Sequence, residues 1–177
     1  YESETTGGSL YYTSGSGNCY AGQNNATKTC DFTSTGIKID KTRGLSSEET
    51  YSLLGWNTSS IYANEIYEYE RSTGKVYSDR SKEWTGKIAL AYPSDYGYAV
   101  DLSKCSQNLN NYENSTCKSN NWMKTIVNNG SSNTGWLLTP YSGNSNHAWY
   151  VALPGYVNYL NFDVYIAAGV APVLYLN

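Results

Sequence analysis

The tract at residues 141–171 limits the possible folds most strongly, because apolar and polar residues alternate along it on both sides of a turn signal. Two alternating segments, AWYVAL and YVNYL, flank the Pro-Gly dipeptide at 154–155, which favours a β-hairpin. Successive side chains of a strand point to opposite faces, so Trp149, Val151 and Val157 are predicted to face the core. The opposite, exposed face is predicted to consist of Tyr150, Ala152, Tyr156 and Asn158.

The composition of this C-terminal tract (residues 141–171) is typical of binding loops. It is rich in Tyr and Asn, and Asp163 is its only formally charged residue. Tyr and Asn provide contact area and hydrogen bonds at a low cost in side-chain entropy. The chain as a whole has 19 Tyr and only 15% charged residues. This composition favours an extracellular binding domain over a cytosolic enzyme.

Charge and length limit the partners and the organisation. The formal net charge is −3, without the basic surface that phosphate backbones require, so we do not expect nucleic acid as a partner. A chain of 177 residues can form one domain with a substantial core, and we predict a single domain over 1–177. No apolar run reaches the roughly 20 residues that span a bilayer, so we expect no membrane contact by this segment. The start at Tyr1, without Met or a signal peptide, suggests a processed chain or an excised ectodomain.

Four cysteines form two close pairs, Cys19 with Cys30 and Cys105 with Cys117. Neither pair has the spacing of a metal knuckle, and His147 is the only histidine. We predict two local disulfides, because each pair brackets a loop rich in Asn, Ser and Thr that a bridge would stiffen. Such bridges require an oxidising compartment. Four free thiols in a cytosolic protein are the alternative.

Two helices are predicted in the first half of the chain. Ser46 and Glu49 have the spacing of a capping box, which predicts a short helix over 47–54 that ends at Gly55. Apolar residues at helical spacing predict a second helix over 59–71, closed by Gly74.

Strands are predicted near Tyr11 and Tyr12, over 88–92, over 136–140 and over 170–176, in addition to the hairpin. Pro172 is tolerated near the start of the last strand. The long loop over 93–121 is predicted to be organised by the Cys105–Cys117 bridge or by a short helix near 121–128. The expected fold class is therefore α+β.

Several motifs together resemble a known group of proteins: GKIALAYPSDYGYAV, the Trp122 segment, WLLTP, AWYV followed by GYV, and GVAPVLYL. In order and spacing they resemble the variable proteins of diversity-generating retroelements, in the prepilin-associated group found in gut Clostridia. The similarity covers Phe32 to Asn177. It implies a C-type-lectin-like fold, in which two helices pack on a twisted, mainly antiparallel sheet. One departure is Ala171, where the group commonly has Arg.

The resemblance implies that a reverse transcriptase rewrites Asn codons in the C-terminal tract by mutating adenines. An Asn codon changed at its first two bases cannot encode Lys, Glu, Gln, Met or Trp. The tract contains none of these except Trp149, which we therefore assign to the constant framework. The positions implied to be diversified, solvent-facing and ligand-binding are Tyr141, Asn144, Asn146, His147, Tyr150, Ala152, Tyr156, Asn158, Tyr159, Asn161, Phe162, Tyr165 and Ala167.

The function implied is a surface-displayed receptor or adhesin domain that binds an unknown protein or glycan. It would be extracellular, at the cell surface or on a pilus, and would assemble with other pilin subunits through an N-terminal helix upstream of Tyr1. We expect no catalytic residues, no cofactor and no metal site. Tyr159 and Phe162 are the positions of the tract that could instead turn inward.

Two other functions are compatible with a related fold. A formylglycine-generating-enzyme-like oxidoreductase needs a reactive, copper-bound cysteine pair, whereas both pairs here lie far upstream of the C-terminal tract. Calcium-dependent sugar binding as a rule needs more than one carboxylate, and Asp163 is the only one after Tyr141. Metal-independent carbohydrate binding through Tyr side chains remains an alternative.

Overall fold

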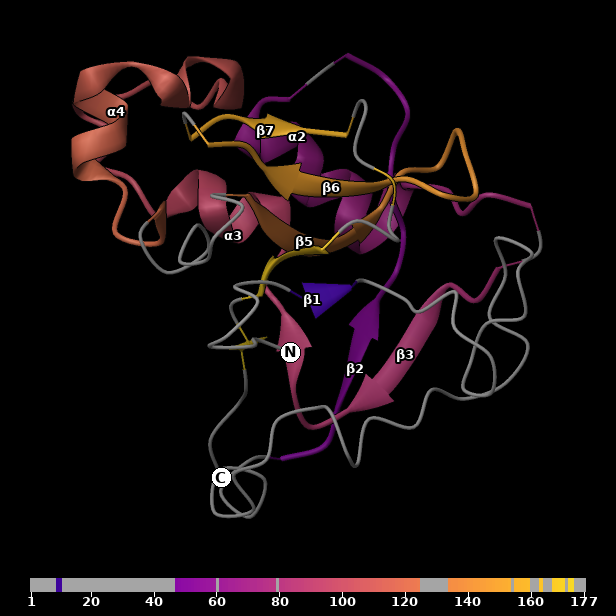
Figure 1. Cartoon of the computed structure of the whole chain (residues 1–177). Helices are drawn as coiled ribbons and strands as arrows, with labels where there is room; N and C mark the ends of the chain where they lie inside the picture. Colours follow the sequence, from indigo (N-terminus) through magenta and orange to yellow (C-terminus); the bar gives the residue numbers. More distant parts are fainter. Residues whose placement is uncertain are drawn as a thin grey trace.

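The computed structural model describes residues 9–10, 47–59, 61–78, 80–124, 134–153, 155–159, 163, 167–170 and 172–173. These residues form an α+β fold, as predicted (Figure 1). The main sheet contains, in spatial order, β1 (Ser9–Leu10), β8 (Ala167–Val170), β5 (Gly135–Pro140), β6 (Ala148–Val151) and β7 (Val157–Asn158). Its pairings are antiparallel except for β5 with β8, which run parallel.

The predicted hairpin and the strand over 136–140 are both confirmed. β6 and β7 pair with Tyr150 opposite Asn158 and Val151 opposite Val157. Gly155 in the connecting turn has φ +114°, a conformation that residues with a Cβ rarely adopt. The hairpin therefore depends on glycine at this position.

The first α-helix among the described residues is α2 (Ala63–Glu68), which continues as a π-helix, η1 (Tyr69–Thr73). The predicted helix over 59–71 is thus confirmed, shifted toward the C-terminus, and Gly74 closes it by donating its N–H to the carbonyl of Tyr69 (2.9 Å). α3 (Pro93–Tyr98) packs against α2 and against β5. Proline at its first position suits a helix start, because that N–H has no intrahelical partner.

The predicted helix over 47–54 is wrong. Residues Glu49–Ser52 form strand β2, which pairs antiparallel with β3 (Glu83–Gly86). Tyr51 is buried and stacks on Trp84 at 5.6 Å between ring centroids, and this cross-strand contact outweighs the local capping signal. Gly55 therefore has no helix to end. Glycine is needed there for another reason, since a Cβ would lie 2.0 Å from the carbonyl oxygen of Pro140. It allows this segment to approach β5.

The long loop predicted over 93–121 is wrong at its start, because α3 occupies Pro93–Tyr98. A disulfide and two further short helices organise the rest of this region. Cys105 and Cys117 are bonded, which confirms the predicted pair. The helices are a 3-10 helix, η2 (Leu109–Glu113), and α4 (Ser115–Asn120). Asn114 caps α4 by accepting from the N–H of Cys117 (2.9 Å). Of the short helix predicted near 121–128, the structure describes only 121–124, where Lys124 is helical, and 125–128 lie outside the described residues.

The remaining strands also depart from prediction in part. β4 (Ala89–Leu90) confirms a short strand within 88–92, and it pairs with β9 (Pro172–Val173). The single strand predicted over 170–176 is instead divided between β8 and β9, with 174–177 outside the described residues. Tyr11, Tyr12, Cys19 and Cys30 also lie outside them. None of the helices that the structure describes has the length and apolarity needed to cross a membrane.

The main core lies between α2 and α3 on one side and the facing side chains of β5, β6 and β7 on the other. Trp149, Val151 and Val157 are all buried there, as the alternation predicted. They contact Ile66 of α2 and Tyr96 of α3 within one cluster. The hairpin is thus anchored through one face.

Glu70 is a fully buried acid in η1 that the sequence patterns did not reveal. Its carboxyl accepts from the backbone N–H of Ser94 (3.2 Å) and from the Ser94 hydroxyl, and Thr139 of β5 lies at 3.5 Å. Burial raises the pKa of Glu70 to about 8, against the lowering effects of Ser94 and of Arg71, 3.4 Å away. Glu70 therefore connects α2, α3 and β5 in its protonated form at neutral pH.

The protonation of Glu70 in the folded protein can be tested with Glu70→Gln, which keeps the shape of the side chain but does not titrate. Between the ordinary pKa of 4.5 and the folded value of about 8, the folded protein holds a proton that the unfolded chain has lost. The wild type should therefore lose stability relative to the variant as pH rises through this window. Urea denaturation of both proteins at about pH 5 and about pH 9 measures the difference. An equal difference at both pH values would contradict the assignment.

Candidate ligand-binding surface

The loop between β5 and β6, residues 141–147, is closed by its own hydrogen bonds. The N–H of Tyr141 donates to the carbonyl of His147 (3.1 Å) at the base of the loop. Within it, Asn144 Oδ1 accepts from the N–H of Asn146 (3.0 Å), the side-chain-to-backbone bond of an Asx turn. The loop therefore presents half-exposed polar side chains from a defined backbone.

Four aromatic rings connect this loop to the core. Tyr141 and Tyr159 stack face to face, with centroids 4.0 Å apart and planes 8° apart. Both rings lie edge-on to Trp149, at 6.1 Å and 4.8 Å. Trp149 in turn stacks on the buried Trp56 at 4.0 Å. We call Trp56, Trp149, Tyr159 and Tyr141 the aromatic column; it joins the surface loop to the interior.

Asp163 joins the loop to the segment that follows β7. Its Oδ1 accepts from Asn146 Nδ2 (2.7 Å) and lies 3.1 Å from His147 Nε2. His147 and Asp163 also form an isolated antiparallel bridge. The side chains of His147 and Asp163 are 19% and 25% exposed, so this cluster is largely shielded from water. His147 is therefore part of the support of the loop.

Seven of the thirteen predicted positions are partly exposed: Tyr141, Asn144, Asn146, His147, Tyr156, Asn158 and Tyr159. Of these, the structure brings Tyr141 and Tyr159 into contact, and Asn146 and His147 onto one carboxylate. Tyr159 packs against the core cluster, which fits the expectation that it could turn inward. Ala167 lies in β8. The remaining predicted positions outside the described residues are Asn161, Phe162 and Tyr165.

The prediction that Tyr150 and Ala152 face solvent is wrong. They do lie on the face of the hairpin opposite Trp149, but they are 7% and 6% exposed. Their side chains form a separate apolar cluster with Trp136 and Ala168 of the neighbouring strands, and Leu90 of β4 packs against this cluster. The ring of Trp136 meets that of Tyr150 edge-on at 6.2 Å. Burial accordingly raises the pKa of Tyr150 to about 12.

Sequence reasoning missed Trp56 and the structural role of Asp163. Trp56 precedes the C-terminal tract by many residues, and no local pattern connects it with Trp149. Asp163 had a usable signal, since it is the one charge in the tract and a shielded carboxylate needs hydrogen-bond donors. The two adjacent polar residues Asn146 and His147 provide them.

The described residues contain no group of three or more His, Cys, Asp or Glu side chains that could hold a metal ion. Cys105 and Cys117 are bonded to each other and buried, so this pair offers no free thiolate. The partly exposed part of the tract consists mainly of amide and phenol groups. Such groups favour contact and hydrogen bonding over proton transfer at neutral pH.

The geometry defines a class of site: a hydrogen-bonded loop with polar side chains, supported by aromatic rings that extend from the core. No protein-family model, no curated protein and no solved structure shows a significant match to the chain. The functional argument therefore depends on this geometry together with the sequence motifs.

The burial of Tyr150 can be tested by comparing it with Tyr156, which lies on the same face of the hairpin. Tyr150→Ala should lower the free energy of unfolding by about 3–5 kcal/mol, because a buried aromatic side chain leaves a cavity. Tyr156→Ala should cost at most about 1–2 kcal/mol, since that side chain is only half-buried. Urea denaturation provides both values. Equal, small losses would show that Tyr150 is exposed after all.

Proposed function

We propose that this chain is a surface-displayed ligand-binding domain of the C-type-lectin-like class, with a C-terminal tract diversified by retroelement mutagenesis. The observation that supports it best is the separation of roles within the tract. Trp149, Val151 and Val157 are buried in the core, whereas Asn144 and Asn146 belong to a partly exposed loop. A domain of this kind can change its surface residues while its fold is held by others.

The arrangement of elements is compatible with a C-type-lectin-like fold. Helices α2 and α3 border one face of a mainly antiparallel sheet, and the tract forms β6, β7 and the adjoining loop. The buried Cys105–Cys117 disulfide fits display in an oxidising, extracellular environment. Assembly of a pilus through a preceding helix would then place many copies of the domain on one filament.

The ligand surface that we propose is narrower than the sequence alone implied. It comprises the β5–β6 loop and the end of β7, where partly exposed side chains gather around the aromatic column. Tyr150 and Ala152 contribute to the second face of the sheet instead. Amide and phenol groups each have several donor and acceptor positions, which suits either a protein or a glycan ligand.

Sequencing the coding region from many sibling cells tests the diversification directly. We expect replacements to concentrate at the codons of Asn144, Asn146 and Asn158, at adenines, and to spare those of Trp56 and Trp149. Tyr150 and Ala152 should tolerate only replacements that fill the same space, because both are buried. Synonymous sites outside 141–171 serve as the control for the background rate. Differences spread evenly over the gene would contradict the proposal.

A further inference from the structure

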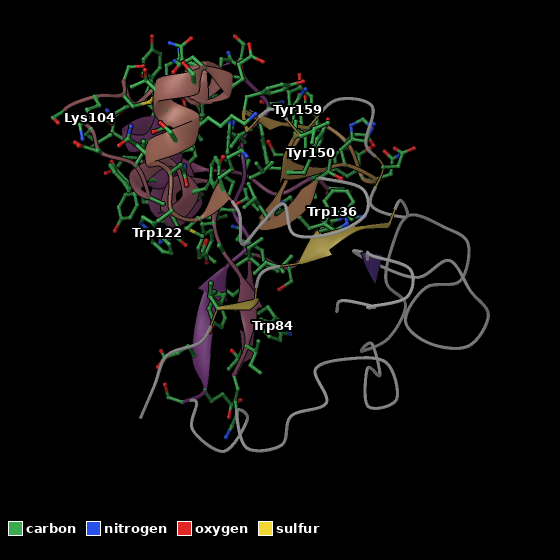
Figure 2. The ribbon with its side chains drawn as sticks, turned by 60° about the vertical axis from the view of Figure 1, so that its left-hand side comes forward. Trp84, Lys104, Trp122, Trp136, Tyr150 and Tyr159 are labelled. Carbon is green, nitrogen blue, oxygen red and sulfur yellow. A yellow bond between two sulfur atoms is a disulfide. The ribbon has the colours of Figure 1, made fainter. Side chains whose placement is uncertain are left out.

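Three exposed aromatic side chains meet at a depression away from the ligand surface. Tyr67 of α2 is 44% exposed, Tyr98 of α3 is 44% exposed, and Trp122, which follows α4, is 67% exposed. Figure 2 shows Trp122 on the left and Tyr159 higher and further to the right, and no residue of 141–171 lines the depression. The depression therefore differs from the surface around the aromatic column.

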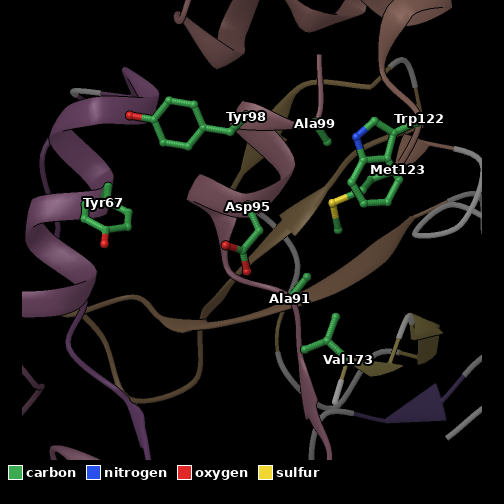
Figure 3. A pocket seen from close by; sticks show the side chains of 8 residues that line it. All are labelled: Tyr67, Ala91, Asp95, Tyr98, Ala99, Trp122, Met123 and Val173. Atoms are coloured by element: carbon green, nitrogen blue, oxygen red, sulfur yellow. The ribbon is translucent and has the colours of Figure 1, made fainter. Parts of the chain in front are cut away.

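The depression is open to solvent and mainly apolar. Its volume is about 380 Å³, within the range of about 300–1,000 Å³ that is usual for ligand pockets. The apolar part of the lining is formed by Ala91, Ala99, Met123 and Val173. Figure 3 shows Asp95 between Tyr67 on one side and Trp122 with Met123 on the other. An acceptor thus lies between aromatic rings.

The charges at this site compensate one another. Arg71 Nη2 lies 3.8 Å from Asp95 Oδ1. The guanidinium carbon of Arg71 lies over the ring of Tyr92 at 3.6 Å and near that of Tyr67 at 5.1 Å. Arg71 therefore already occupies the position that a cationic ligand would take on the ring of Tyr67. Because Arg71 and Asp95 neutralise each other, the site offers no net charge to a ligand, which favours an uncharged one.

We propose that this depression binds a neutral saccharide. A pyranose ring has C–H faces that pack on exposed aromatic rings such as Trp122 and Tyr98, and hydroxyl groups at its edge. Asp95 Oδ2 accepts from the N–H of Tyr92 (2.9 Å), yet each carboxylate oxygen has a further lone pair for a sugar hydroxyl. This inference does not rest on the proposed function, because none of the lining residues belongs to 141–171.

Calorimetric titration with uncharged hexasaccharides tests the proposal, with cellohexaose, xylohexaose, laminarihexaose and mannohexaose as probes. At least one of them should bind, and Trp122→Ala should weaken that binding about tenfold or more. Trp122→Phe keeps an aromatic face and should retain most of the affinity. Tyr77→Ala is the matched control, because Tyr77 is also exposed, at 40%, but does not line the depression.

Tetramethylammonium chloride and hexagalacturonic acid provide the charged comparison. The proposal is overturned if none of the four neutral hexasaccharides binds, or if either charged probe binds more tightly than all of them. It is also overturned if Trp122→Ala and Tyr77→Ala weaken binding equally. Thermal unfolding of each variant shows whether it is folded, and Tyr98→Ala replaces Trp122→Ala if the latter does not fold.

Discussion

The face-to-face contact between Trp56 and Trp149, with ring centroids 4.0 Å apart, is the interaction on which the rest of the site depends. Both side chains are buried, and they join the segment after β2 to β6, the first strand of the hairpin. Tyr159 and Tyr141 then extend this contact to the loop. The surface loop is thereby positioned by aromatic packing that begins in the core, with Asp163 as a second attachment.

The sheet separates two kinds of position because both of its faces are covered. One face packs on α2 and α3. The other face carries the apolar cluster that includes Trp136 and Tyr150, against which Leu90 of β4 packs. Under the proposed function, freedom to vary would therefore belong to the loop and the strand end, because the residues on both faces of β6 are buried. This restricts the chemistry of recognition to residues such as Asn144 and Asn158, whose exchange leaves the buried clusters intact.

Local patterns predicted the hairpin, the buried face of Trp149 and the Cys105–Cys117 bridge, because period-two alternation and short cysteine spacing are local signals. They could not predict that Tyr150 is buried, since its cover comes from Trp136 on another strand. The helix predicted over 47–54 failed for the same reason: the partner that makes Tyr51 a strand residue lies on β3. The outcomes that sequence reasoning missed were thus determined by long-range contacts.

The most direct measurement is a comparison of two libraries expressed on a cell surface and sorted for resistance to protease. In one library, Asn144 and Asn158 are randomised; in the other, Trp56 and Trp149 are randomised. If the aromatic column holds the fold and the loop is free to vary, most members of the first library should survive, and few of the second beyond those with aromatic residues. Equal survival of the two libraries would contradict this account of the protein.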